Sequence, residues 1–440
     1  MKKTLLAALC ASSLGLGACD LGVPDLNNPS LDTLQDHPTS SGVYSAATGL
    51  LIGNRNAKAA QNGYVAHLGI LGRESYTFDA ADPRYVTEML AGASLDPGSP
   101  AFGGNLWVQP YANIRNANTL LAAVDKVAGV TDEDKESIRG FAQTQQALDF
   151  LAIVTTRDTN GGPIDVGGDY NSLAPIESKE KLLAHIVELL DESKTHLEAS
   201  GAKFPFPLSS GYAGFDTPKT FILFNRAVKA RVDVYRQDWA GALTDLSASF
   251  LDTQKPLTLG VYYSFGSGSG DTTNGLTSPN IYAHPSLVAD ADKKANGDLD
   301  DRVTQKIKEV DPRTYQGLTS KYVFTMYSSN SAPVALIRNE ELILLRAEAN
   351  IGLNNIPAAA TDINFIRTTS GGLAPRADLD ATNILDELLK QRRYSLLFEG
   401  GHRWIDMRRY GKLSELPVDK PDESVHDKFP IPVAETDARQ

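Results

Sequence analysis

The stretch NEELILLRAEANIGLNNIPAAATDINFIRT, residues 339–368, decides the fold class of this chain. Leu342, Leu345 and Ala349 recur at intervals of three and four residues, which places them on one face of a helix. Residues 352–355 (Gly-Leu-Asn-Asn) form a turn, and apolar residues then recur at the same spacing, namely Ile356, Ala359, Ile363 and Ile366. The stretch therefore predicts a tight helical hairpin.

Similar periodicity on both sides of this hairpin predicts further helix pairs. Thr217-Pro218 is typical of a helix start, because threonine caps the first turn and proline suits the first helical position. We expect helical hairpins at about 104–157, 217–251 and 339–368, and C-terminal helices at 383–410. These pairs are close to the length of a tetratricopeptide repeat, although they lack its strict consensus. We therefore predict a mainly α fold of tetratricopeptide-like helical hairpins stacked into an α-α superhelix.

Residues from about 260 to 335 differ in composition from the helical segments. They are rich in Gly, Ser, Asn, Tyr and Pro, so they cannot form a regular helix. A long irregular segment inside a compact domain is more often functional than not. We expect this insert to form an irregular, loop-rich face that carries the ligand site.

The N-terminus has the pattern of an export and lipidation signal. Lys2 and Lys3 precede the short apolar stretch Thr4 to Leu16, which is too short to span a bilayer and is typical of a signal peptide. The stretch ends in Leu16-Gly17-Ala18-Cys19, which looks like a bacterial lipobox. We expect residues 1–18 to be removed and Cys19 to carry diacylglycerol and a fatty acid such as palmitate. Ordinary secretion with an accidental cysteine is the alternative.

The remaining domain organisation follows from composition. Residues 19–41 are rich in Pro, Asn, Asp and Ser and are expected to form a lipidated tether, followed by a single domain at 42–440. No later apolar run is long enough to span a membrane, so the lipid would be the one membrane attachment. The formal net charge of −12 argues against nucleic-acid binding, which needs clustered Lys and Arg.

The last hundred residues resemble a known family. Residues 338–367 are similar to the central repeat of the SusD/RagB family, and residues 391–411 resemble its C-terminal signature. Phe429-Pro430-Ile431-Pro432 matches the terminal element of that family. The resemblance implies a cell-outer-membrane lipoprotein that faces the exterior and is not an enzyme. It also implies an oligosaccharide ligand, sometimes a peptide, and delivery to a TonB-dependent outer-membrane transporter barrel.

Charged residues in the matching segments invite a catalytic interpretation that we do not adopt. Arginine cannot act as a proton-transfer base, and charges on consecutive helices are expected to form ion pairs that lock the corner. We therefore assign a structural role to the following charged set: Arg338, Glu341, Glu348, Arg367, Glu399, Arg403, Asp406 and Arg409.

Aromatic residues in the irregular segments are the ligand-binding candidates, because sugar C–H groups stack on aromatic rings. The candidates are Tyr76, Phe78, Tyr85, Tyr262, Tyr263, Phe265 and Tyr282. Packing beneath the loops is the alternative for each. Trp107 and Trp239 lie at helical spacing and are expected in the core.

We expect no catalytic residue, metal or cofactor. The histidines lack a paired metal-binding spacing. Asp290, Asp292 and Asp298 resemble a calcium loop, but Lys294 and Val303 occupy ligand positions of the EF-hand pattern, so an acidic loop is preferred to an irregular calcium site. Two other functions stay open: a lipid-anchored helical-repeat scaffold for envelope proteins, and an envelope glycoside hydrolase.

Overall fold

The computed structural model describes residues 34, 36–99, 104–167, 173–268 and 271–440. Cys19, the expected signal peptide and most of the expected tether lie outside the described residues. Within the described ranges, no helix combines the length and the apolar character that crossing a membrane requires.

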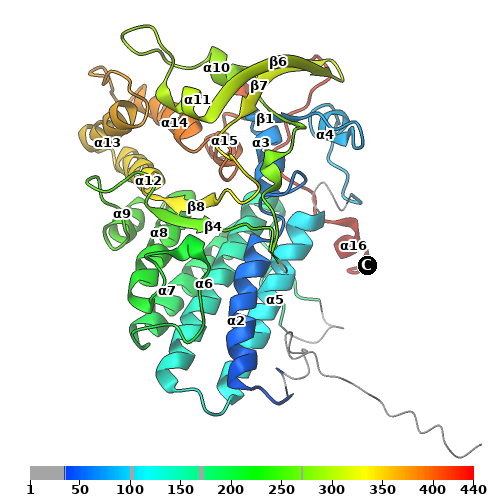
Figure 1. Ribbon diagram of the computed structural model, residues 1–440, viewed down its shortest axis with the longest axis vertical. Helices are drawn as coiled ribbons and strands as arrows, with labels where there is room; N and C mark the ends of the chain where they lie inside the picture. The colour runs from blue at the N-terminus through cyan, green and yellow to red at the C-terminus, as the bar shows by residue number, and fades with distance from the viewer. Residues whose placement is uncertain (1–33, 35, 100–103, 168–172, 269–270) are drawn as a thin grey trace, which may run out of the picture.

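Antiparallel helices stacked in chain order form the larger part of the molecule (Figure 1). They are α2 (Ser40–Arg55), α5 (Asn105–Lys126), α6 (Asp132–Arg157), α7 (Lys179–Glu198), α8 (Pro218–Arg236), α9 (Trp239–Ser247), α12 (Asn339–Gly352), α13 (Ile356–Thr369) and α14 (Ile384–Ser395). Each helix packs on the next in this order, including α9 on α12 across the insert. The predicted mainly α fold of stacked helical hairpins is confirmed.

Four of these helices begin where hydroxyl side chains cap them, the first at Thr39, which accepts from the Gly42 backbone N–H at the start of α2. The Thr131 hydroxyl accepts a hydrogen bond from the Asp134 backbone N–H at 3.1 Å at the start of α6. Ser178 caps α7 through the N–H of Lys181, and Thr217 caps α8, where proline is the first helical residue. Each cap satisfies a backbone donor that the first turn leaves without a partner.

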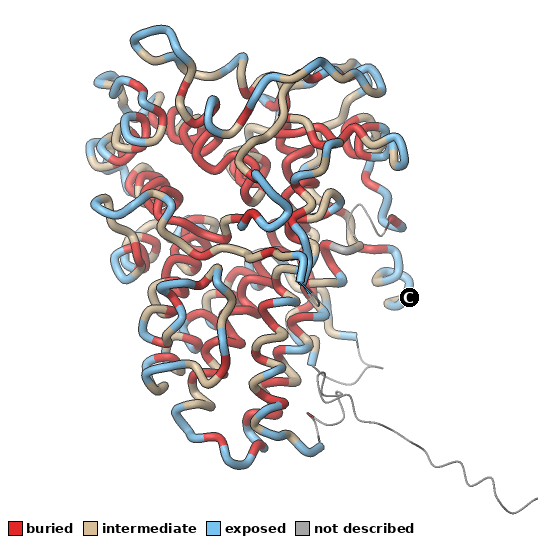
Figure 2. Tube along the Cα trace, in the orientation of Figure 1, coloured by how far each residue is buried: buried red, intermediate tan, exposed pale blue. Residues whose placement is uncertain are grey.

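The apolar stripes of the helices meet in a large shared core. Figure 2 shows buried segments along the inner sides of the helical stack. Trp107 is buried as expected, with 4% of its surface exposed, whereas Trp239 is half-buried and lies against Gly352. Burial of apolar surface in such a core contributes the main favourable free energy of folding.

The rest of the chain forms short helices and two-stranded sheets, and the strand pair at 307–324 lies at the top of the view in Figure 1. Its strands pair as β1 (Ser75–Thr77) with β5 (Ile281–Ala283), β4 (Gly260–Tyr263) with β8 (Val334–Arg338), and β6 (Ile307–Tyr315) with β7 (Leu318–Phe324), while β2 (Gly162–Pro163) pairs with β3 (Ile176–Glu177). Its helices are α3 (Tyr64–Leu71), α4 (Arg84–Thr87), α10 (Ser286–Ala289), α11 (Asp301–Lys306), α15 (His402–Arg409) and α16 (Val433–Asp437).

The sequence analysis did not predict the long β6–β7 hairpin inside the insert. Its two-residue turn is Gln316-Gly317, and both residues have positive φ, 51° and 82°. Such a turn follows the natural twist of the paired strands. A glycine between two runs containing aromatic and β-branched residues was the sequence signal that could have identified this hairpin.

Candidate functional site

A cleft of about 330 Å³ opens where the end of α2 meets the turn at 207–212, residues 262–264 and Asp271. Its lining combines aromatic, apolar and polar side chains, namely Thr48, Leu51, Ile52, Asn54, Arg55, Pro207, Leu208, Ser209, Tyr212, Tyr262, Tyr263, Ser264 and Asp271. Ile52 is 51% exposed, which is unusual for a large apolar residue. We call this hollow the tyrosine cleft.

Two of the predicted ligand-binding residues, Tyr262 and Tyr263, lie in the tyrosine cleft. Both end strand β4 and both are half-buried. The Tyr262 hydroxyl donates to the carbonyl of Thr258 at 2.5 Å, which fixes its ring. Burial raises the pKa of both phenols, so both stay protonated; the proton of Tyr262 is engaged by Thr258, which leaves its hydroxyl oxygen to accept.

An ion pair stands beside the two tyrosines. The Arg55 guanidinium lies 2.8 Å from the Asp271 carboxylate and also donates to the carbonyl of Ser264 at 2.5 Å. Such a charged pair offers donors and acceptors to the hydroxyl groups of a ligand. The two residues are far apart in the sequence, and no local spacing links them, so the sequence analysis missed both.

Asp271 is the one carboxylate residue among the described residues that line the tyrosine cleft. Hydrolysis of a glycosidic bond by the common mechanism needs two carboxyl groups that flank the bond. The cleft therefore has the chemistry of a binding site and lacks that catalytic arrangement.

The other aromatic candidates lie outside the cleft. Tyr76, Phe78 and Tyr85 are 1%, 0% and 3% exposed, and the Tyr76 and Phe78 rings stack with their centroids 5.3 Å apart. Phe265 is 9% exposed in a neighbouring apolar cluster. These four residues pack beneath the loops, which is the alternative that the sequence analysis left open for them. Tyr282 is half-buried with the Arg313 guanidinium over its ring.

A larger groove of about 610 Å³ runs beside α5 and includes Trp107 and Tyr111. Two of its polar side chains are engaged by protein partners, whereas Asp165 is exposed and has no side-chain partner among the described residues. The Tyr111 hydroxyl donates to the carbonyl of Pro163, and Arg439 binds Glu435 and the carbonyl of Ala174. We prefer the tyrosine cleft as the candidate functional site, because two of the residues predicted to bind ligand, Tyr262 and Tyr263, line it.

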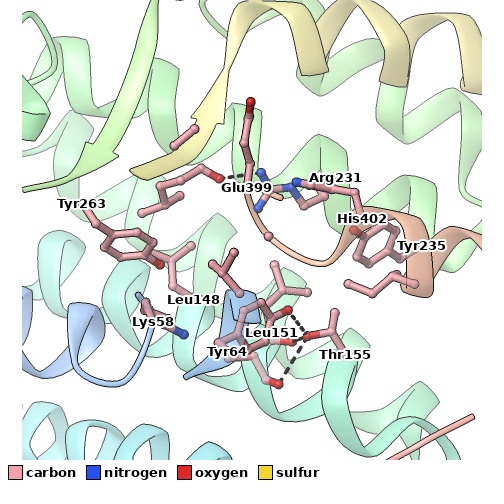
Figure 3. A pocket seen from close by; sticks show the side chains of 16 residues that line it. Lys58, Tyr64, Leu148, Leu151, Thr155, Arg231, Tyr235, Tyr263, Glu399 and His402 are labelled. Carbon is pink, nitrogen blue, oxygen red and sulfur yellow. Dashed lines mark hydrogen bonds between the residues drawn. The ribbon is translucent and has the colours of Figure 1, made fainter. Parts of the chain in front are cut away.

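A small cavity of about 60 Å³ shares Tyr263 with the cleft (Figure 3). Lys58, Tyr64, Tyr235 and His402 are among its lining residues. We call it the inner cavity. Lys58 is 7% exposed, and burial lowers its pKa although the charge of Asp149 acts in the opposite direction.

Asp149 connects the inner cavity with the tyrosine cleft. Its two carboxylate oxygens accept hydrogen bonds from the side-chain amides of Asn54, at 2.9 Å, and Asn113, at 2.6 Å. Burial raises the pKa of Asp149 to about 7, although Lys58 and the amides lower it in part. Asn54 also lines the cleft, so one side chain links the Asp149 carboxyl group to the candidate site.

Most of the charged residues assigned a structural role are buried, Arg403 and Arg409 are half-buried, and most of the set form ion pairs. Arg338 donates to Glu399 at 2.8 and 3.0 Å, and Arg409 lies 2.8 Å from Glu348 and 2.7 Å from Asp406. Further pairs join Arg231 to Glu341 and Arg367 to Glu387. Arg403 differs, since it has neither a hydrogen bond nor an ion pair with any described residue.

The carboxylates of the calcium-like loop are balanced by cations of the protein. Asp290 pairs with Arg393 at 2.9 Å, and Asp292 pairs with Arg367 at 2.9 Å and with Lys390. Asp298 lies 4.0 Å from Lys294. In the part of the chain that the structure describes, no group of three or more His, Cys, Asp or Glu side chains could hold a metal ion.

Comparison with known proteins gives a consistent result for sequence and fold. Residues 314–437 match the model of the SusD family. No curated protein matches the chain by sequence. Among solved structures, a SusD-like carbohydrate-binding protein from Bacteroides fragilis has a TM-score of 0.70 at 14% identity, covering 92% of this chain and 99% of its own.

Two other solved structures have the same fold. The surface glycan-binding protein A of Bacteroides thetaiotaomicron has a TM-score of 0.68 at 14% identity, covering 91% of this chain and 97% of its own. A laminarin-binding SusD-like protein has a TM-score of 0.65 at 15% identity, covering 91% and 98%. At such identities the likeness establishes the fold alone.

Proposed function

This chain belongs to the SusD family, and from that premise we propose that it is a non-catalytic cell-surface lipoprotein that binds an oligosaccharide nutrient. In this proposal the protein delivers the ligand to a TonB-dependent transporter in the outer membrane. Neither step requires a cofactor. The observation that carries the proposal is the tyrosine cleft, where Tyr262 and Tyr263 stand beside the paired charges of Arg55 and Asp271.

The chemistry of the cleft fits a carbohydrate. The C–H face of a sugar ring packs on an aromatic ring, and its hydroxyl groups need donors and acceptors at the rim. A volume of about 330 Å³ lies at the small end of the range for small-molecule sites, roughly 300–1,000 Å³. We therefore expect the cleft to hold a short part of a longer oligosaccharide.

A covered strand edge argues against a peptide at the same place. Extended peptides commonly add a strand to an open sheet edge. One edge of β4 pairs with β8. The turn at Gly211 lies next to the other edge of β4, so close that a Cβ added to Gly211 would come within 1.9 Å of the Tyr262 carbonyl oxygen. The Gly211 N–H donates to the Ser264 hydroxyl at 2.8 Å. β4 therefore offers a peptide no free edge.

The proposal for lipid anchoring and for a transporter partner rests on other observations. The lipobox at Cys19 supports an acylated N-terminus, and the family resemblance supports the transporter. Relatives of the same fold include a surface glycan-binding protein and a laminarin-binding protein, which supports a glycan ligand at the cell surface.

Isothermal titration calorimetry of the mature chain against a panel of neutral oligosaccharides and short peptides tests the ligand class. We expect saturable binding of at least one oligosaccharide. Tyr262→Ala and Asp271→Asn should each weaken it by at least tenfold, because they remove the stacking surface and a charged acceptor. Tyr322→Ala, which removes a half-buried tyrosine outside the cleft, is the matched control.

Two outcomes would contradict the proposal. Binding of peptides alone would exclude the glycan assignment, and glycan binding that survives both cleft substitutions would exclude the tyrosine cleft. The transporter partner is tested separately by mild-detergent purification of the natively acylated protein. Recovery without any stoichiometric barrel protein would contradict that part and favour the envelope scaffold.

A further inference from the structure

The inner cavity presents hydrogen-bond donors that have no partner among the described residues. The Lys58 ammonium group lies over the Tyr64 ring, 5.1 Å from its centroid, and makes neither a hydrogen bond nor an ion pair with any described residue, although Lys58 is only 7% exposed. The hydroxyl groups of Tyr235 and Tyr263, which line the same cavity, also have no hydrogen-bond partner. Figure 3 shows Lys58 and Tyr263 on one side of the cavity and Tyr235 on the other.

Most acceptors at the cavity wall are already occupied. The Glu399 carboxylate accepts two hydrogen bonds from Arg338, and Arg231 donates to the carbonyl of Leu336 at 2.7 Å. The hydroxyl groups of Tyr64 and Thr155 bond each other at 2.9 Å. Among the described groups left free, the Lys58 ammonium group can only donate, whereas the tyrosine hydroxyls and the neutral His402 ring can also accept. An occupant that accepts hydrogen bonds would satisfy Lys58.

The charges around the cavity leave Lys58 without a contacting counter-ion. Arg231, from α8, is neutralised by Glu341, from α12, and Glu399 is neutralised by Arg338 and Lys306. His402, from α15, has its pKa lowered by burial to about 4, so the ring is neutral at pH 7. Asp149, from α6, is the remaining charged group, and its oxygens are held by two amides and form no ion pair with Lys58.

We propose that the inner cavity is a binding site for a small monovalent anion of halide size, held by the Lys58 ammonium group and the hydroxyl group of Tyr263. The volume of about 60 Å³ holds a few water-sized particles, which leaves room for one such ion and little else. Chloride is the abundant ion of this class outside cells.

An anion fits this cavity better than water alone. An ammonium group far from bulk water is costly unless it is paired, and Coulomb attraction is stronger in a low-dielectric interior. Apolar side chains make up much of the remaining wall, including Val65, Leu148, Leu151, Leu336 and Ile405. Because Tyr263 also lines the tyrosine cleft, the bound ion would fix one wall of the candidate ligand site.

Anomalous diffraction from crystals of the mature chain grown in bromide salt tests the site directly. We expect a bromide peak within hydrogen-bond distance of the Lys58 ammonium nitrogen and the Tyr263 hydroxyl oxygen. The peak should be lost in Lys58→Met and kept in Lys203→Met, which replaces an exposed lysine elsewhere. A cavity that holds only water in the wild-type crystal overturns the proposal without any variant having to fold.

A solution measurement distinguishes a physiological site from binding at crystal concentration only. The thermal midpoint is followed while chloride replaces gluconate at constant ionic strength, since gluconate is too large for the cavity. We expect a saturable rise for the wild type and for Lys203→Met, because ligand binding to the folded state raises stability. A bromide peak in the crystal combined with a chloride-independent midpoint would overturn the proposal as well.

Discussion

The Arg231–Glu341 pair allows the interior electrostatics to be tested quantitatively. Arg231 on α8 donates to the two carboxylate oxygens of Glu341 on α12 at 2.6 and 2.7 Å, and the residues are 7% and 2% exposed. Replacing Glu341 with Gln keeps the shape of the side chain but leaves the guanidinium charge buried without compensation. Loss of one partner of a buried pair costs about 3–5 kcal/mol of unfolding free energy.

The pH dependence of this loss has a definite sign. Burial alone would raise the pKa of Glu341, but Arg231 outweighs it, and the pKa is lowered. A carboxyl group with a lowered pKa contributes stability that is present above its unfolded pKa of about 4.3 and is lost as the pH falls through the folded value. The difference between wild type and Glu341→Gln should therefore be constant above about pH 5 and shrink in acid.

Urea unfolding at several pH values measures this difference. Glu415→Gln is the control, because Glu415 forms an exposed ion pair with Lys412 whose loss should change stability by about 1 kcal/mol or less. The double variant Arg231→Met/Glu341→Met should regain most of the loss, since no unpaired charge remains. A loss below about 1 kcal/mol for Glu341→Gln at pH 7 would refute the reasoning.

Three further predictions concern single sites. The pKa of about 7 for buried Asp149 lies above its unfolded value of about 3.9, so the stability that Asp149 contributes is full at low pH and is lost as the pH rises to about 7. The thermal midpoint of Asp149→Asn should therefore rise relative to that of the wild type over this pH interval. A difference between the two midpoints that does not change with pH would contradict this prediction. Gly352→Ala should lower the free energy of unfolding in urea by about 1–3 kcal/mol, because the added Cβ would lie 2.3 Å from the Trp239 ring. Gly49→Ala, at a position in α2 with open space around it, should raise that free energy by about 0.5–1 kcal/mol. Equal effects of the two substitutions would exclude the packing argument. Phe398→Ala should lower the free energy of unfolding by about 3–5 kcal/mol in the same assay, because the Phe398 ring is fully buried and stacks on Phe324 with the ring centroids 4.2 Å apart. A loss below about 1 kcal/mol would be incompatible with that burial.

The helical stack could be predicted because its determinants are local. Leu342, Leu345 and Ala349 repeat at helical spacing, and all three are fully buried in the structure. Thr217 was predicted to cap a helix, and it caps the first turn of α8. Spacing and capping act within a few residues, so a single sequence reveals them.

The candidate site could be predicted only in part, because it depends on contacts between distant segments. Tyr262 was found by its chemical type and its place in an irregular stretch, and Arg55 and Asp271 meet only after folding. Chemical type alone could not separate Tyr262 from Tyr76, since burial is decided by the elements that pack on each ring. The donor-rich inner cavity likewise joins residues from several elements, so no sequence pattern reveals it.

A crystal structure of the mature chain with its tightest-binding neutral oligosaccharide tests the central claim most directly. The account predicts a sugar ring against Tyr262, with its hydroxyl groups within hydrogen-bond distance of the Arg55 or Asp271 side chains. A sugar bound in the groove beside Trp107 and Tyr111, with the tyrosine cleft left free, would contradict it.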